Sequence, residues 1–543
     1  MLRLPGRPAA TVLAFLAAAL GAGGCATPDE YAAEADEAVY ELIAARRDAL
    51  RSEPGGFRAE RAAALRAELE AEVRPRIRLD LVGALEAAAD NSREVQDRRE
   101  RLFLAALDLT LERWRFGWRP TLTGGADVSG TGGAGGDASA EADLGLQRLF
   151  GSGAVVIADL GTSLVRALAE GDGWDALSSL SLSITQPLLR GAGREVVTEP
   201  LTQAERNLVY EVRSYERFRR TFAVDVIADY YGLLRSQDAI RNEEANLESL
   251  RLLRARNEAL AEAGKMTDIQ VDQARQDELR SENRLLQLQA AYDAQVDRFM
   301  VRLGLPPKVE LELDPDVIAG LRELDGSDLE GLDATWLQAV AAERRLDYLN
   351  TVDRLVDAER RARIAADALR AGLDLEASLG ASSEPGRPLA FRSDAAPWSL
   401  GLSYDLPVDR LPERNLYRRA LVEVEAARRA VEADGDGILQ ALRDDLRQAL
   451  STLAQYRIQR SSVDLAAKRV RSAQLKLEAG RSSTRDVLEA QRDLLSAQNA
   501  ATSALIDFAL ARLRLWRDLE LLEVDPSGIH LLPLPEPEAP ALP

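Results

Sequence analysis

The chain has 543 residues, a formal net charge of −20 and only 5% aromatic residues. This acidic balance excludes a nucleic-acid partner, because binding phosphates requires a basic face. No stretch reaches the roughly 20 consecutive apolar residues of a transmembrane helix.

The first 24 residues have the features of a processing segment. Two arginines precede a short apolar core at Thr11–Leu20, and the sequence GAGGC ends at Cys25, the only cysteine of the chain. This start resembles a bacterial lipoprotein signal, which implies cleavage after residue 24, a lipid on Cys25 and attachment to outer-membrane lipid. An ordinary secretory signal with an incidental cysteine is the alternative. The lone cysteine also excludes an intramolecular disulfide.

Proline and glycine divide the first half into elements. Apolar residues recur at helical spacing from Leu79 to Gly117, and Pro120 ends that pattern. Residues 120–190 are rich in Gly, Ser and Thr and alternate with period two, which predicts strands. A long helix then begins near Pro200, and no further proline occurs before Pro306.

The second half repeats this order. We expect a helix over 334–371, strands in 372–380 and 397–409, and long helices in the proline-free run 413–522. The glycines of the sequence ADGDG at 433–437 should interrupt or kink the first of these long helices.

A short stretch around a glycine occurs twice, at 261–279 and 477–495. Seven of the 19 aligned positions are identical, which indicates an internal duplication. The glycine in each copy divides a helix of about 64–67 residues from one of about 37, so at 1.5 Å per residue the longer helix spans roughly 100 Å. We therefore expect a turn with positive φ at Gly264 and at Gly480. The identical pairs are Glu262/Glu478, Ala263/Ala479, Gly264/Gly480, Val271/Val487, Ala274/Ala490, Asp277/Asp493 and Leu279/Leu495.

The predicted strands have one apolar face and one small or polar face. This pattern fits a membrane β-barrel with a wet lumen or a soluble sandwich. The two hairpins of one chain cannot close a barrel, and open strand edges are not tolerated in lipid, so the membrane interpretation requires an oligomer. An additional hairpin at 141–165 would add strands to the barrel or form an extracellular projection.

This duplicated order resembles the TolC-type outer-membrane efflux proteins over roughly residues 79–520. The second tip has the family motif at Gly480, Asp486, Val487, Leu488 and Ala490, and the first tip matches it at Gly264, Val271 and Ala274, with Gln270 in place of the Asp. The resemblance implies a mainly α fold with a membrane β-barrel portion. It also implies a homotrimer with a 12-stranded barrel and a long α-helical periplasmic tunnel built from two internal repeats.

The resemblance sets the expected domain boundaries. These are a signal peptide at 1–24, a lipid-anchored N-terminal segment at 25–78, a first repeat at 79–305, a linker at 306–333, a second repeat at 334–520 and a C-terminal tail at 521–543. The end of the tail, LLPLPEPEAPALP at 531–543, has a composition typical of disorder.

The function that the resemblance implies is a passive exit duct of a tripartite efflux or type I secretion system. The duct would connect a periplasmic adaptor protein and an inner-membrane pump to the exterior. Adaptor docking would fall on the two tips, at Gly264, Lys265, Val271, Gly480, Arg481, Val487 and Leu488.

Two acids at the second tip form a candidate periplasmic gate. Asp486 and Glu489 are three residues apart and so lie on one helical face, while the first tip has Gln270 and Gln273 in their place. Crowding around a narrow axis should raise the pKa of some of these carboxyls. The alternative role is capping of the helix N-terminus, where negative charge is favourable.

Other classes of function are less well supported by the residues. His530 is the only histidine, and no glycine-rich phosphate loop or zinc cluster is found, so we expect neither catalysis nor a cofactor or metal. A lipid-anchored periplasmic coiled-coil structural protein or adhesin without transport activity is the remaining alternative.

Overall fold

The computed structural model describes residues 27–49, 64–71, 76–131, 134–167, 175–314, 316–384, 387–392, 396–479, 481–525 and 528–535. Cys25, Gly480 and residues 536–543 lie outside this part. The chain divides into two compact units, of which the first comprises Met1–Phe57, Leu102–Val212 and Val352–Arg429. The second unit comprises Arg58–Arg101, Arg213–Thr351 and Ala430–Pro543.

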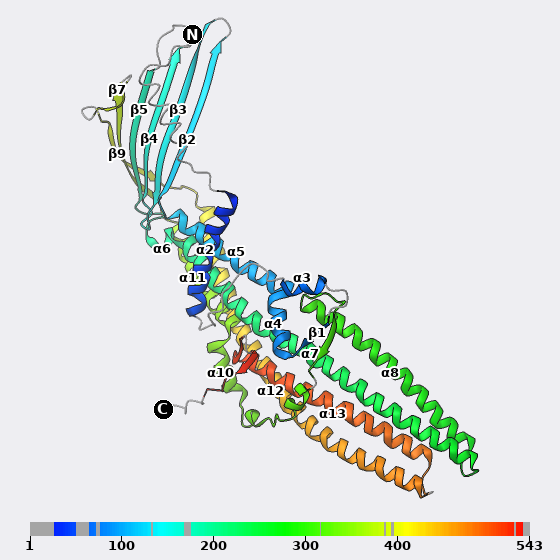
Figure 1. Ribbon diagram of the computed structural model, residues 1–543. Coiled ribbons are helices and arrows are strands. Elements are labelled where there is room, and N and C mark those ends of the chain that lie inside the picture. The colour runs from blue at the N-terminus through cyan, green and yellow to red at the C-terminus, as the bar shows by residue number, and fades with distance from the viewer. Residues whose placement is uncertain are drawn as a thin grey trace, which may run out of the picture. The chain divides into compact units, whose positions relative to one another are not determined.

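The first unit contains an antiparallel sheet (Figure 1). Its long strands follow the spatial order β2, β3, β4, β5, β7, β9, and the short β8 pairs with the end of β7. The hairpin expected at 141–165 is thus part of the sheet, between β2 and β5. The strands are β2 (Arg119–Thr131), β3 (Ala134–Leu149), β4 (Val155–Ala167), β5 (Asp175–Pro187), β7 (Gly372–Glu384), β8 (Arg387–Phe391) and β9 (Trp398–Asp405).

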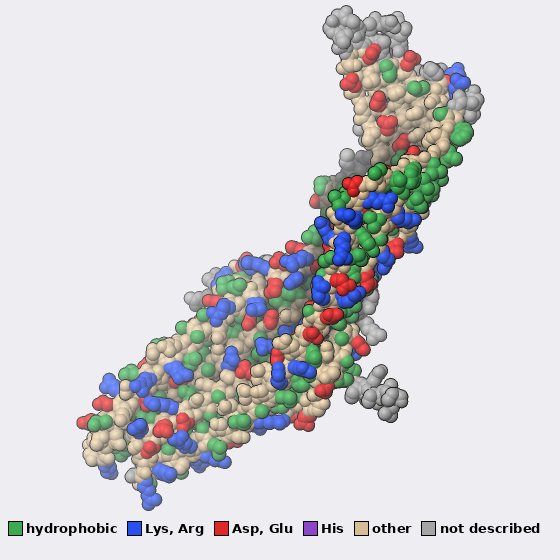
Figure 2. Space-filling view, turned by 180° about the vertical axis from the view of Figure 1, so that it is seen from behind, with side chains coloured by type: hydrophobic (Ala, Val, Ile, Leu, Met, Phe, Trp, Pro, Cys, Tyr) green, Lys and Arg blue, Asp and Glu red, His purple; other side chains and the backbone are tan. Residues whose placement is uncertain are grey.

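The register places apolar and polar residues on opposite faces of this sheet. One cross-strand row runs through Leu122, Leu144, Leu160 and Leu180, and the adjacent row, on the other face, runs through Thr123, Asp143, Gly161 and Ser179. Figure 2 shows Asp and Glu side chains scattered among small and polar residues at the sheet end of the chain. The predicted alternation of one apolar and one small or polar face is confirmed.

Helices complete the first unit. They are α2 (Pro28–Ala49), α6 (Arg194–Val197) and the adjoining parts of α5 (Arg93–Arg115), α7 (Glu199–Glu262), α11 (Leu346–Asp367) and α12 (Leu411–Glu478). Val39 and Ile43 of α2 are fully buried, and the rings of Tyr40 and Phe103 are 5.9 Å apart. Helix α2 therefore packs on α5 within this unit.

The second unit is built around two long helical hairpins, α7–α8 and α12–α13 (Figure 1). Helices α7 (Glu199–Glu262) and α12 (Leu411–Glu478) have 64 and 68 residues, and α8 (Asp268–Arg302) and α13 (Thr484–Asp518) have 35 each. These helix lengths agree with those predicted from the positions of the glycines and prolines in the sequence. The core beneath the hairpins includes the fully buried Tyr230, Phe299 and Phe508. No helix in the described ranges is long and apolar enough to cross a membrane.

Two predicted helices are interrupted. The helix expected over 334–371 is split at Arg345 into α10 (Ala334–Arg344) and α11 (Leu346–Asp367), because Arg345 is extended at ψ 112°. Its guanidinium binds Asp347, 2.9 Å away, at the start of the next helix. The segment expected over 79–117 forms α4 (Leu81–Asn91) and α5 (Arg93–Arg115).

The expected interruption at 433–437 was wrong, since α12 is helical throughout this stretch. Tertiary contacts account for the difference. The carbonyl of Gly435 accepts from the side-chain amide of Gln338 at 3.3 Å, and Asp434 accepts from the hydroxyl of Thr351 at 2.7 Å. Packing against α10 and α11 therefore offsets the low helix propensity of glycine.

Short elements connect the helices of the second unit. β1 (Arg76–Leu79) pairs in parallel with β6 (Glu310–Leu313) of the predicted linker. The other connecting elements are α3 (Ala64–Ala71), α9 (Asp316–Leu321) and a 3-10 turn at Ser327–Leu329.

The C-terminal tail is ordered further than its composition suggested. β10 (Leu522–Asp525) pairs with β11 (Gly528–Leu531), and the carbonyl of Leu532 accepts from the indole nitrogen of Trp516 at 3.1 Å. The prediction of disorder is wrong for residues 531–535, because the leucines of this segment pack on the core.

Candidate functional site at the helical tips

The first tip reverses the chain between α7 and α8. Gly264 has φ 69°, a conformation that costs an L-residue with a side chain about 1–2 kcal/mol. Its amide donates to the carbonyl of Ala261 at 2.9 Å, and the amide of Lys265 donates to the carbonyl of Leu260 at 2.8 Å. These bonds satisfy the carbonyls at the end of α7. The predicted glycine turn is confirmed here.

The second tip has the same closing bond but a stronger start to its next helix. The amide of Arg481 donates to the carbonyl of Lys476 at 2.8 Å, as Lys265 does to Leu260 in the first tip. Ser483 caps α13, and Ser483 and Asp486 form a reciprocal capping box. The corresponding cap of α8, Thr267, makes no side-chain hydrogen bond to the helix.

The capping box determines the charge state of Asp486. Its carboxylate accepts from the amide of Ser483 at 2.8 Å and from the hydroxyls of Ser482 and Ser483 at 2.8 and 2.9 Å. These bonds, the backbone one first, lower the pKa of Asp486 from 3.8 to about 2. Within the chain this shift is opposite in sign to the rise that we expected from crowding, because the hydrogen bonds stabilise the charged form.

Glu489 is exposed but is already paired within the chain. Its carboxylate lies 2.9 Å from a guanidinium nitrogen of Arg469 on α12, and the same arginine also binds Asp493. The structure thus places the two predicted gate acids in different interactions, one in a cap and the other in a surface ion pair.

The predicted docking residues divide by exposure. Gly264, Lys265 and Arg481 are exposed, Val271 is half-buried, and Gly480 lies outside the described residues. Val487 and Leu488 are buried, and we name their surroundings the tip core, which consists of Leu250, Leu253, Ala473, Val487, Leu488 and Ala490. These two residues therefore join α13 to α7 and are not available to a partner in this conformation.

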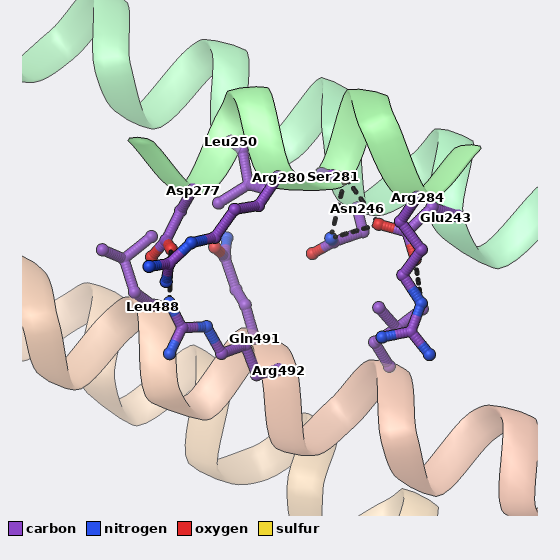
Figure 3. A pocket seen from close by; sticks show the side chains of 11 residues that line it. Glu243, Asn246, Leu250, Asp277, Arg280, Ser281, Arg284, Leu488, Gln491 and Arg492 are labelled. Atoms are coloured by element: carbon purple, nitrogen blue, oxygen red, sulfur yellow. Dashed lines mark hydrogen bonds and ion pairs between the residues drawn. The ribbon is translucent and has the colours of Figure 1, made fainter. Parts of the chain in front are cut away.

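Next to the tip core lies a polar pocket of about 240 Å³ between α7, α8 and α13 (Figure 3). Glu243 of α7 is 1% exposed and accepts from the hydroxyl of Ser281 at 2.6 Å and from the amide of Asn246 at 3.2 Å. Asp277 of α8 is also buried and accepts from Arg492 of α13. Each acid thus has polar partners that fix the relative positions of the helices.

Sequence reasoning missed this pocket. The only available signal was the alignment of Asp277 with Asp493, which does not distinguish their environments. Asp277 is buried against Arg492 of the other repeat, whereas Asp493 is exposed and pairs with Arg469. Chemically, the pocket holds paired charges. Within the described ranges, no group of three or more His, Cys, Asp or Glu side chains is placed to hold a metal ion.

The fold is similar to that of solved outer-membrane channels. CusC, whose structures concern folding and transmembrane channel formation, superposes with a TM-score of 0.58 at 13% identity over 81% of this chain and 91% of its own. VceC of Vibrio cholerae gives 0.57 at 17% identity over 81% and 95%, and CmeC of Campylobacter jejuni gives 0.58 at 14% identity over 81% and 85%.

The predicted TolC-type fold, mainly α with a β portion, is thereby confirmed. At sequence identities of 13–17%, the structural similarity to these channels establishes the fold alone. No protein-family model matches the chain, and no curated protein matches its sequence.

Proposed function

We propose that the chain is the subunit of an outer-membrane exit duct. It would conduct substrate passively from a periplasmic adaptor and an inner-membrane pump to the exterior, without catalysis. The observation that carries the proposal is the likeness of 81% of the chain to channels described as outer-membrane proteins. The exposed apolar face of the sheet supports it, because lipid is the environment that such a face fits.

The assembly that we propose is a homotrimer. An open sheet leaves two strand edges with unpaired backbone groups, and lipid offers no water to satisfy them. Closure by further copies of the chain removes both edges. A lipid on Cys25 would add a membrane anchor, which mass spectrometry of the mature chain tests directly.

The tips are the proposed contact with the adaptor. Lys265 and Arg481 occupy equivalent, exposed positions directly after the two turns and offer positive charge to a partner. Gly264, Val271, Gly480, Val487 and Leu488 would shape the turns beneath them. We keep Asp486 and Glu489 as the acidic pair of a proposed periplasmic gate. Asp486 would stay charged in mild acid there, since its pKa is about 2.

Paired substitutions on the two faces of β5 test this function. Leu180 lies on the apolar face and Ser181, the next residue, on the polar face. Arg on a lipid-facing position of a barrel costs about 2–4 kcal/mol near the bilayer midplane. We therefore expect Leu180→Arg to lose trimer insertion, while Ser181→Arg inserts and changes the conductance in planar bilayers.

The matched control is the unsubstituted protein. Light scattering in detergent gives the mass of its assembly, and its conductance is recorded in the same bilayers. A parent chain that is extracted without detergent after removal of its lipid and forms no pores would contradict the duct. That outcome would favour the structural protein or adhesin. Equal behaviour of the two arginine variants would contradict the assignment of the sheet faces.

A further inference from the structure

The hairpin β3–β4 is paired with its neighbours in the sheet along most of its length. β3 pairs with β2 from Arg119↔Gln147 to Thr131↔Ala134, and β4 pairs with β5 from Val155↔Thr185 to Val165↔Asp175. The hairpin has no free edge in the described sheet. It therefore separates β2 from β5, which would be neighbours without it.

Side chains on the polar face interlock the hairpin with both neighbours. A Cβ atom at Gly145 of β3 would lie 2.4 Å from the hydroxyl oxygen of Thr121 on β2. One at Gly161 of β4 would lie 2.8 Å from a carboxylate oxygen of Asp143 and 3.1 Å from the hydroxyl oxygen of Ser179 on β5. The two glycines thus make room for side chains of adjacent strands, which fixes the register of the hairpin.

One row of leucines on the apolar face continues across the hairpin from β2 to β5. Leu122 of β2, Leu144 of β3 and Leu180 of β5 lie in one row and are 56%, 48% and 45% exposed. A hairpin that projected into water would not need a leucine in the same cross-strand row as the leucines of β2 and β5. The hairpin therefore has the same lipid-facing character as the strands on either side.

The number of long strands permits closure between copies. In the part of the chain that the structure describes, six long antiparallel strands run from β2 to β9, so these two outer strands point in opposite directions. β2 of one copy can then pair with β9 of the next copy in antiparallel fashion. Cyclic repetition of this contact leaves no open edge.

We propose that a second copy of this chain pairs with each outer strand and that all six strands belong to the barrel wall. This proposal rests on the proposed trimer. Three copies give 18 strands, in place of the 12 that the TolC-type resemblance implies. Barrel diameter grows roughly in proportion to strand number, so the barrel is about 1.5 times wider. Barrels of about this strand number enclose an aqueous channel, which here admits bulkier cargo.

Disulfide cross-linking between edge strands tests this wall. Cysteine at Thr121 or Thr123 of β2 is combined in one chain with cysteine at Ser399 or Ser403 of β9, all on the polar face. We expect mild oxidation of the assembled trimer to give covalent dimers and trimers on denaturing gels. Single-cysteine variants control for a contribution of Cys25.

The matched control places the first cysteine on β4, at Asp159 or Ser163, with the same β9 positions. Both edges of β4 are occupied, so we expect no β4–β9 product. Cross-linking of β4 to β9 in a conducting trimer would overturn the 18-stranded wall while leaving the duct intact. If no pair reacts, the strand count in an electron cryomicroscopy reconstruction of the parent trimer decides, and 12 strands overturn the proposal. A parent chain that neither trimerises nor conducts contradicts the proposed function instead.

Discussion

Arg492 of α13 donates to the carboxylate of Asp277 on α8, so a residue of the second repeat holds a buried acid of the first. Only 9% of the Asp277 side chain is exposed, whereas 58% of Arg492 is. Arg280, one turn further along α8, approaches the same carboxylate oxygen at 3.4 Å. Two arginines therefore offset the desolvation of one acid, and one of them links the two helical hairpins.

We expect Arg492→Gln and Asp277→Asn to be coupled in a double-mutant cycle. A hydrogen bond to a charged, largely buried group contributes about 1–2 kcal/mol, reduced here by the exposure of the arginine. The measurement is the free energy of unfolding in detergent. The matched control is the cycle of Arg469 with Asp493, an exposed pair at the equivalent repeat position, whose coupling we expect to be smaller. Equal couplings in the two cycles would contradict the role of burial.

The two tips should respond differently to loss of the cap residue. Ser483→Ala removes the capping box and should destabilise the start of α13 by about 1 kcal/mol. Thr267→Ala removes a side chain that makes no capping bond and should have little effect. Hydrogen exchange of the first-turn amides of α13 and α8 measures both changes. Similar losses at the two tips would refute the asymmetry.

The pH dependence of the second tip follows from the low pKa of Asp486. The folded-state pKa is about 2 and the ordinary value is 3.8, so the stabilisation is complete above the ordinary value and is lost as pH falls through about 2. We expect Asp486→Asn to abolish this dependence. Melting curves of both proteins between neutral pH and pH 2 provide the measurement, and parallel curves would contradict the prediction.

Asp445 should make the second unit less stable as pH rises. Burial, together with the neighbouring Asp518 carboxylate, raises the pKa of Asp445 from 3.8 to about 7. For an acid with a raised folded-state pKa, the stabilisation is present below the ordinary value and is lost as pH rises through the folded-state value. Asp445→Asn should therefore raise the melting temperature at pH 8 and have little effect at pH 4. An equal shift at both pH values would contradict this assignment.

Alanine substitutions at Gly304 and Gly331 should show how much stability is lost when a side chain is placed against a neighbouring backbone. Both have positive φ, 75° and 78°. A Cβ at Gly304 would lie 1.9 Å from the carbonyl oxygen of Asn91, whereas one at Gly331 would have no atom of the described residues within 4 Å. We expect Gly331→Ala to cost about 1 kcal/mol of backbone strain and Gly304→Ala several times more. Thermal unfolding of the two variants checks this, and equal losses would be the contrary result.

Local sequence signals predicted the long helices, the glycine turn at Gly264 and the faces of the strands. They failed at one helix break and at one glycine inside a helix. Arg345 carries no glycine or proline signal, yet it ends α10, and Gly435 carries a breaking signal, yet it lies within α12 in contact with Gln338. The continuity of α12 at Gly435 depends on a tertiary contact that a single segment does not contain, whereas the interaction that accompanies the break at Arg345 is the local ion pair with Asp347.

The candidate site shows the same limit. The motif located Asp486, but its spacing did not distinguish a gate from a cap, because both roles place an acid in the first turn of a helix. Val487 and Leu488 matched the tip motif, yet their burial depends on α7, more than 200 residues earlier in the chain. The residues that line the pocket around Glu243 come from separate helices and form no motif in the sequence.

The pairing of β1 with β6 has a consequence for the order of folding. Arg76 and Glu310, which face each other in this pair and form an ion pair at 2.7 Å, are separated by 234 positions. The first repeat thus lies inside one long loop whose closure costs chain entropy, and the local helical hairpin α7–α8 should form before that loop closes. As the chain emerges from amino to carboxyl end, β1 stays without its partner strand until the whole first repeat has been delivered. During this interval its exposed edge is available to a chaperone or to a wrong strand.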